Sequence, residues 1–432
     1  MGQTIFTNAN VLDGVNPSTA GQTVVVEANQ IKRVLNHQWK NLQPGDVIYD
    51  LGGRTIMPGM VIGHYHATYE GIGPGSPPVG MEVPPALQTV RAVRHLRMAL
   101  HAGFTSVISA GAPYGIDASC KIGIEQGLIE GPRIMAGSRD VSTTGHVQDC
   151  FYQWHWGPGM GPQTNIVDGP DGFRRAVREE VKRGAEIIKV FASTGHGLPP
   201  ARYSMELTED ELSAAISTAH ERGAKIRAHL ARKDAIMASV KLGIDVVDHG
   251  DGLDEECIDL MLKKGTFLVP SLYFPHCVSR TFEGPLPDEM KADLDKMLRI
   301  LPQANKSGLK ITLGDDYGAT PLSHGRYGEE PAYYVTEAGI PPLDVIRWAT
   351  ANGAEMMDMG RELGRIKEGY LADLLIVDGD PTVDIGILKT PEALRAIMKN
   401  GNFIKNTLAR STDSKGSSPA ESSMANLATH VA

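Results

Sequence analysis

Cysteine is scarce in this chain. Its 432 residues include only four, Cys120, Cys150, Cys257 and Cys277, and no two of them form a CxxC pair. So few scattered thiols exclude a scaffold built on disulfides and are typical of a protein kept in a reducing cytosol. They are also a poor set of zinc ligands, so we expect any metal to be bound by acidic residues and by some of the 14 histidines.

Long apolar runs are lacking as well. No window contains the roughly 18 consecutive apolar residues of a membrane span, and the start, MGQTIFTNAN, has no basic region followed by an apolar core. Basic charge is in deficit, since the net charge is −9. We therefore expect no membrane segment, no secretory signal and no nucleic-acid partner, because phosphate binding requires basic patches. The expected location is the cytoplasm.

What is present is the composition of a folded protein. Hydrophobic residues make up 41% and charged residues 22% of the chain, which excludes a mainly disordered protein. Residues 1–58 contain short alternating or apolar segments typical of β-strands. From Gly59 onward, short apolar strands alternate with helical patterns that often end at a glycine. The predicted strands of this part are Pro58–His64, Phe104–Ser109, Arg133–Ala136, Glu186–Phe191, Lys225–His229, Asp245–His249, Thr266–Pro270 and Lys310–Asp315.

This order of elements predicts an α/β fold. Alternating strands and helices imply a parallel sheet, and eight such units predict a (β/α)8 TIM-like barrel over residues 59–357. Because β character returns after Asp358, we expect residues 1–58 and 358–409 to form one small β-sandwich domain. Residues 410–432 are rich in Ser, Ala, Asn and Thr and have little to bury, which predicts a disordered tail.

Polar side chains recur where the predicted barrel strands end. They are His64, His66, Lys189, His229, His249, Asp315 and Asp316. A single HxH pair arises readily by chance in a chain with 14 histidines, and a lone histidine at a strand end is often only a hydrogen-bonded surface residue. The combination is more specific, because the active site of such a barrel forms at the carboxyl ends of its strands.

Two features of this set point to a metal site. His64 and His66 are two residues apart, so both imidazoles lie on the same side of an extended chain and can reach one ion. Lys189 lies within an apolar strand, where burial would lower its pKa. A neutral amine can react with CO2 to give a carbamate, an anionic ligand able to bridge two cations. In the alternative interpretation, Lys189 extends to the rim of the barrel or pairs with an acid.

With these residues in order, the chain resembles the amidohydrolase superfamily. That family has HxH after strand one, a carboxylated lysine after strand four, histidines after strands five and six, and aspartate after strand eight. The segments Thr55–Met60 and Leu363–Leu374 also resemble the family's entry into the barrel and its return into the β-domain. Because the family's aspartate follows Gly-x, the resemblance selects Asp316 over Asp315.

The resemblance implies a binuclear site, most often holding zinc. One ion would be bound by His64, His66 and Asp316, and the other by His229 and His249. Carboxylated Lys189 and a hydroxide would bridge the two ions. Asp316 would accept the proton of the attacking water and pass it to the leaving nitrogen.

Within the superfamily, the chain looks most like the branch of imidazolonepropionase, Xaa-Pro dipeptidases and hydrolases of amide- or urea-type xenobiotics. By resemblance, His146 would contact the substrate carbonyl or its oxyanion; otherwise it is a hydrogen-bonding loop residue. Arg232 is a candidate clamp for a substrate carboxylate, or else a solvated residue in the first turn of a helix. The Gly-rich loop Ser193–Gly197, together with Tyr203, is a candidate lining of the pocket.

Three functions compete at this stage. The first is cleavage of a C–N bond in a dipeptide or an N-acyl amino acid by the two-metal site. The second is the same chemistry on a bulky, mainly apolar amide, carbamate or urea. The third is a barrel with a degenerate site that acts as a binding protein. The complete ligand set favours a metal-dependent hydrolase with a small-molecule substrate, and we expect a homo-oligomer.

Overall fold

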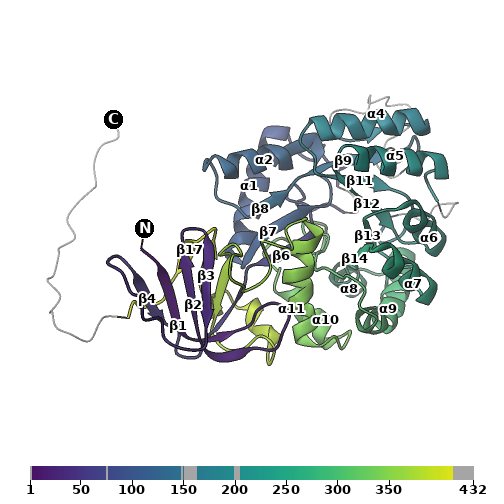
Figure 1. The fold of residues 1–432 in the computed structure, drawn as a ribbon. Helices are drawn as coiled ribbons and strands as arrows, with labels where there is room; N and C mark the ends of the chain where they lie inside the picture. Colours follow the sequence, from purple (N-terminus) through teal and green to yellow (C-terminus); the bar gives the residue numbers. More distant parts are fainter. Residues whose placement is uncertain (1, 74–75, 147–148, 150–162, 199–204, 412–432) are drawn as a thin grey trace.

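A computed structural model describes residues 2–73, 76–146, 149, 163–198 and 205–411. A mixed β-sheet lies at one side of the molecule, and parallel strands flanked by helices make up the rest (Figure 1). Within the described residues, no helix is long and apolar enough to cross a membrane. Most of the predicted tail lies outside the described residues.

The mixed sheet takes strands from both ends of the chain. Its strands are β1 (Thr4–Val11), β2 (Thr19–Glu27), β3 (Gln30–Leu35), β4 (Val47–Asp50), β5 (Thr55–Pro58), β15 (Leu374–Val377), β16 (Leu394–Lys399) and β17 (Asn402–Asn406). Their order is β17-β16-β15-β5-β1-β2-β3, and β4 pairs with β1. The two ends meet where β15 runs antiparallel to β5. Phe6, Tyr49 and Phe403 pack ring against ring on one buried face.

The parallel strands form two further sheets. They are β6 (Met60–Tyr65), β7 (Phe104–Ser109), β8 (Arg133–Met135), β9 (Gly137–Ser142), β10 (Asn165–Ile166), β11 (Ile187–Phe191), β12 (Lys225–Leu230), β13 (Val246–His249) and β14 (Phe267–Val269). One sheet has the order β6-β7-β8 and the other β10-β9-β11-β12-β13-β14. Only Ala136 separates β8 from β9, so one stretch of chain continues from the first sheet into the second.

The predicted eighth strand, Lys310–Asp315, is reduced to one β-bridge, between Ile311 and Leu268. The segment nevertheless lies between β14 and β6. The Thr312 amide donates to the Leu268 carbonyl (3.0 Å), and the Gly63 amide donates to the Leu313 carbonyl (2.5 Å). These bonds place the end of the segment beside the end of β6. The arrangement is TIM-barrel-like. That the barrel is closed, and that the mixed sheet forms a β-sandwich, remain predictions from the sequence.

Helices cover the outside of the parallel strands (Figure 1). They are α1 (Pro85–His101), α2 (Ile116–Glu125), α4 (Gly169–Lys182), α5 (Glu209–Glu221), α6 (Lys233–Leu242), α7 (Glu255–Lys264), α8 (Tyr273–Thr281), α9 (Pro285–Lys306), α10 (Glu329–Thr336), α11 (Pro342–Arg347) and α12 (Gly353–Met356). Shorter 3-10 turns are η1 (Pro113–Gly115), η3 (Ile385–Lys389) and η4 (Pro391–Ala393), and η2 (Trp348–Asn352) is a π-helical turn. As the sequence predicts, α6 and α7 end at Gly243 and Gly265, both in the left-handed conformation that favours glycine.

Candidate metal centre

Three side chains converge at the end of β6. His64 Nε2 lies 3.2 Å from His66 Nε2 and 3.0 Å from Asp316 Oδ1, and His66 Nε2 lies 3.4 Å from the same carboxylate oxygen. The alternation of side chains along a strand puts both imidazoles on one side. His249 also belongs here, since it can offer a ligand atom within 4.8 Å of those of His64 and Asp316. Nitrogen and carboxylate oxygen atoms in this grouping suit a divalent ion such as zinc.

His66 and His229 each have one ring nitrogen within hydrogen-bond distance of a backbone carbonyl oxygen. His66 Nδ1 lies 3.1 Å from the Gly111 carbonyl, and His229 Nε2 lies 3.1 Å from the Gly195 carbonyl. A ring that donates to a carbonyl through one nitrogen presents the lone pair of the other nitrogen to a metal. Burial lowers the pKa of His64, and it lowers the pKa of His229 and His249 still further. The rings of His64, His229 and His249 are therefore neutral, the form that binds a metal.

Asp316 faces the histidines, whereas the side chain of its neighbour Asp315 is hydrogen-bonded to the start of α8. Asp315 Oδ2 accepts backbone hydrogen bonds from Tyr273 and Phe274, at 2.8 and 3.2 Å. Burial acts to raise the pKa of Asp316, but the histidines around it, His64 first and then His66 and His249, together outweigh burial and hold that pKa well below its usual range. The preceding Gly314 has φ +151°, and a Cβ there would lie 2.1 Å from the His64 amide nitrogen. Glycine thus permits the close approach that brings Asp316 to this cluster.

Lys189 is buried within β11 and contacts an acid. Its Nζ donates to Asp248 Oδ2 at 2.7 Å, and His64 Nδ1 lies 3.2 Å from Asp248 Oδ1. Arg227, fully buried on β12, also pairs with Asp248 and donates to the Gly63 carbonyl oxygen at 2.9 Å. Sequence reasoning missed Arg227 and Asp248. The available signal was a charge inside each apolar strand, two residues before His229 and one residue before His249.

His196 is a third residue at this site that the predicted ligand set omits. It follows β11 in the Gly-rich loop, and its ring stacks on that of His249 with centroids 3.8 Å apart. Its Nδ1 lies 3.0 Å from Asp251 Oδ1. Burial acts to lower the pKa of His196, but the charge and hydrogen bond of Asp251 together with the charges of Asp316 and Asp315 outweigh burial and raise that pKa to about 9. The sequence signal was a histidine between two glycines at the catalytic end of a strand.

The predicted substrate contacts lie in different surroundings. His146, after β9, is buried; its Nδ1 lies 3.0 Å from Ser142 Oγ and its Nε2 lies 3.6 Å from Glu206 Oε1. Burial lowers the pKa of His146 to about 4. Arg232 immediately precedes α6, with a side chain 38% exposed and Nη2 3.2 Å from Glu289 Oε1. Tyr203 lies outside the described residues.

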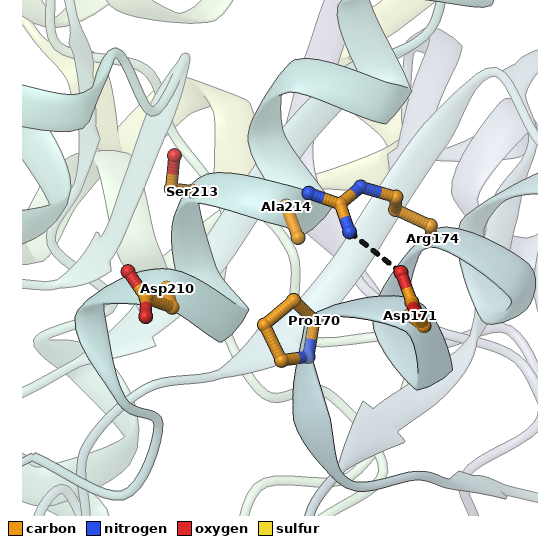
Figure 2. Close-up of a pocket in the computed structure, with 6 residues that line it drawn as sticks. All are labelled: Pro170, Asp171, Arg174, Asp210, Ser213 and Ala214. Atoms are coloured by element: carbon orange, nitrogen blue, oxygen red, sulfur yellow. Dashed lines mark hydrogen bonds and ion pairs between the residues drawn. The ribbon is translucent and has the colours of Figure 1, made fainter.

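A pocket of about 420 Å³ lies between α4 and α5 (Figure 2). Its lining comprises Pro170, Asp171, Arg174, Asp210, Ser213 and Ala214. The Arg174 guanidinium pairs with Asp171 at 2.7 Å within the same helix. The pocket belongs to the outer helical layer and shares no lining residue with the histidine cluster.

Known proteins resemble this chain along most of its length. The model of the amidohydrolase family matches residues 55–405. An ochratoxinase from Aspergillus niger is 29% identical over 376 residues, which cover 81% of this chain and 76% of that enzyme. Among solved structures, a Xaa-Pro dipeptidase with bound methionine in its active site has a TM-score of 0.83 at 26% identity, covering 94% of this chain and 100% of that one. A prolidase complexed with N-methylphosphonate-L-proline has a TM-score of 0.83 at 29% identity, with the same coverage.

Proposed function

Because the chain belongs to the amidohydrolase family and is a hydrolase acting on amide or peptide C–N bonds, we propose that it uses two divalent metal ions to cleave a dipeptide or an N-acyl amino acid. Zinc is the metal expected. The observation that carries this proposal is the convergence of His64 Nε2, His66 Nε2 and Asp316 Oδ1 within 3.4 Å of one another. Similarity to a Xaa-Pro dipeptidase and a prolidase supports the substrate class.

The ligands fall into two groups. His64, His66 and Asp316 would hold one ion, and His229 and His249 the other, with carboxylated Lys189 shared between the ions. When bound, the ions would lower the pKa of a water molecule to near neutrality and polarise the scissile carbonyl. Asp316 would take the proton of the attacking water and deliver it to the leaving nitrogen.

The contact between Lys189 and Asp248 is compatible with a carbamate. Neutral Lys189 Nζ adds to CO2 and loses one proton, giving a carbamate whose nitrogen keeps one N–H. That N–H can still donate to Asp248 Oδ2, which accepts from Nζ at 2.7 Å. Arg227, paired with the same carboxylate, offsets its negative charge. Asp248 would thus orient both the carbamate and the imidazole ring of His64.

Substrate selection would rest on His146 and Arg232. His146, neutral because burial lowers its pKa, would donate a hydrogen bond to the substrate carbonyl or its oxyanion. Arg232 would bind a substrate carboxylate with its planar fork. To do so, the Arg232 guanidinium would release the Glu289 carboxylate, which lies 3.2 Å away, and bind the substrate carboxylate instead.

A second candidate keeps the metal chemistry and changes the substrate. The pairing of Arg232 with Glu289 neutralises the cation that a carboxylate would need. A bulky, mainly apolar amide is this second candidate, and similarity to an ochratoxinase, whose name gives a toxin as its substrate, supports a substrate other than a dipeptide. Carbamates and ureas belong to the same substrate class.

Elemental analysis and a substrate panel test the proposal together. We expect two ions per chain after preparation with zinc and bicarbonate, and one ion or none would contradict the binuclear site. The panel compares N-acyl amino acids and Xaa-Pro dipeptides with neutral anilides and phenylureas. Faster turnover of the carboxylate-bearing compounds supports the first candidate, and faster turnover of the neutral compounds replaces it with the second.

We also propose that residues 59–357 form the catalytic barrel and that residues 1–58 and 358–409 form a separate β-sandwich domain. The shared mixed sheet of β1–β5 and β15–β17 supports this division. A cytoplasmic location and a homo-oligomeric state stay predictions from the sequence.

A further inference from the structure

Arg227 is an arginine buried in the interior of the molecule. It lies in β12 between Ile226 and Ala228, both of which are buried, and its own side chain is 0% exposed. A buried charge is costly unless it is paired and hydrogen-bonded. The partners of Arg227 therefore indicate what this side chain holds in place.

The Arg227 guanidinium donates to oxygen atoms on three other strands. Nε donates to Asp248 Oδ2, on β13, at 3.0 Å, and Nη2 donates to Asp248 Oδ1. Nη1 donates to the backbone carbonyl oxygens of Gly63, on β6, and Ser109, on β7, each at 2.9 Å. A guanidinium presents its donors in a rigid planar fork, so these partners are held at fixed positions relative to one another.

These hydrogen bonds connect the two parallel sheets. Strands β6 and β7 belong to one sheet, and β12 and β13 belong to the other. On the first sheet, Gly63 immediately precedes His64. On the second, Arg227 lies two residues before His229, and β13 ends at His249. The guanidinium therefore links the strand of the HxH pair to the strands of the other two histidines.

The His64 ring lies against this link. Its Nδ1 is 3.1 Å from Arg227 Nη2 and 3.2 Å from Asp248 Oδ1. Its centroid is 5.2 Å from that of the His249 ring. Groups that contact the far side of a metal-binding imidazole determine how the ring is oriented, and they affect metal affinity strongly.

We propose that Arg227 is a positioning residue, whose guanidinium fixes β6 and Asp248 relative to each other and so holds His64 in the orientation that binds zinc. Arg227 acts through His64 and contacts neither metal nor substrate. The inference rests on the proposed metal site. It goes beyond compensation of the Asp248 charge, because a lysine would supply the same charge without the fork that also holds two backbone carbonyls.

Arg227→Lys separates the fork from the charge. The lysine keeps a cation beside Asp248, but its single ammonium cannot also bind the Gly63 and Ser109 carbonyls in the geometry of the fork. Zinc affinity, measured without substrate by competition with a chelator, should be about 10- to 100-fold weaker in Arg227→Lys, the range for a lost residue that orients a metal ligand. Unchanged zinc affinity would overturn the proposal.

Arg139 provides a matched control. This arginine is also buried, on β9, and its Nη2 pairs with Glu180, on α4, at 2.6 Å. Arg139→Lys should lower the urea midpoint of unfolding and leave zinc affinity unchanged. An equal loss of zinc affinity in Arg139→Lys and Arg227→Lys would overturn the proposal, since the loss would then be a general effect of disturbing a buried arginine.

A second pair of variants decides the question if Arg227→Lys does not fold. In Asp248→Asn, the amide oxygen still accepts from Arg227. In Arg227→Met/Asp248→Asn, both charges of the ion pair are removed, which disturbs a fold less than removal of one partner. The double variant should bind zinc more weakly than Asp248→Asn, because it alone loses the hydrogen bonds to Gly63 and Ser109. Equal zinc affinity in the two would overturn the proposal.

The zinc measurement keeps this inference separate from the proposed function. If the unmodified protein binds zinc but hydrolyses no compound of the panel, the proposed function fails, and the zinc affinities still decide the role of Arg227. If the unmodified protein binds no zinc, both are overturned together. Equal zinc affinity in Arg227→Lys and the unmodified protein would overturn this inference alone.

Discussion

The candidate metal ligands fall into two groups, the two halves of the site, and only one of them is already assembled in the structure. Around His64, His66 and Asp316, the ligand atoms already face one another at 3.0–3.4 Å. In the other half, His229 and His249 stand beside a lysine that is engaged with Asp248 at 2.7 Å. The first half is therefore formed by side chains in their ordinary chemical state. In the proposed binuclear site, the second half would require Lys189 to become a carbamate before its ligands are complete.

The first half can be assembled by folding alone, whereas the second would also require the addition of CO2 to Lys189. Strand alternation and the close approach at Gly314 are sufficient to assemble the first half. In the second half, a charged Lys189 would repel a cation, whereas its carbamate would attract one. The two halves should respond differently to substitution, and the following measurements test that difference.

Removing Lys189 should have the largest effect. In Lys189→Ala, we expect turnover to be abolished and one of two ions to be lost, because the first half keeps its ligands and the second half does not. Short carboxylic acids added in solution should restore part of both properties. Lys399→Ala is the matched control, since this half-buried lysine on β16 donates to the Gly131 carbonyl, far along the chain from the cluster. Normal turnover and two ions in Lys189→Ala would contradict the carbamate.

Replacing Asp316 should have the next largest effect. Asp316→Asn should lower kcat about 100- to 10,000-fold, the range for a lost general acid–base group. Asp315→Asn is the control, because both oxygens of the Asp315 side chain accept backbone hydrogen bonds, Oδ2 from Tyr273 and Phe274 and Oδ1 from Asp316. Burial together with Glu330 raises the pKa of Asp315 well above its ordinary value, so Asp315→Asn removes little charge and should lower kcat much less than Asp316→Asn. Steady-state kinetics showing the reverse order would identify Asp315 as the proton carrier.

Arg232 lies outside both halves and should affect only one class of substrate. A charge-assisted hydrogen bond contributes about 1.5–3 kcal/mol, so Arg232→Met should lower kcat/KM about 10- to 150-fold for carboxylate-bearing substrates. Neutral amides should be unaffected. Arg174→Met, which changes an arginine paired with Asp171 on an outer helix (Figure 2), should affect neither class. An equal loss for both classes would assign Arg232 a structural role.

The smallest expected effect concerns stability. The pKa of His146 is about 4 in the folded protein and about 6.5 in an unfolded chain. Because the folded pKa is the lower one, the neutral ring stabilises the fold fully above pH 6.5, and this stabilisation is lost as the pH falls from 6.5 to 4. It amounts to about 3 kcal/mol. Urea unfolding across this range should show a steeper loss in the unmodified protein than in His146→Gln, and parallel curves would contradict the shift.

Much of the fold and family could be predicted from the sequence. The amidohydrolase family, predicted from the histidines at strand ends, is confirmed. The sequence did not predict β9, because its buried residues include Ser138, Arg139 and Asp140, which do not form an apolar pattern. Arg139 is tolerated there because its guanidinium pairs with buried Glu180 at 2.6 Å.

The site shows the same limit. Histidine spacing indicated which side chains meet, whereas the partners Arg227, Asp248 and Asp251 emerged only from the structure. Each belongs to a different strand or loop from the residue that it orients. Contacts between elements distant in sequence leave no periodic signal in a single chain, so the orienting residues could not be identified from spacing alone.

The pairing of β15 with β5 has a consequence for how the protein is made. Pro58 lies opposite Leu374, so the whole segment between β5 and β15 is synthesised between two strands that must pair. While the ribosome makes that segment, the edge of β5 that pairs with β15 in the folded protein is unpaired. Ile56, which is buried opposite Ile376 in the folded sheet, lacks this partner until β15 has been synthesised. Pairing between positions so far apart is slow, and unpaired edges promote aggregation. The mixed sheet should therefore be the last part of the nascent protein to fold and the part most dependent on chaperones.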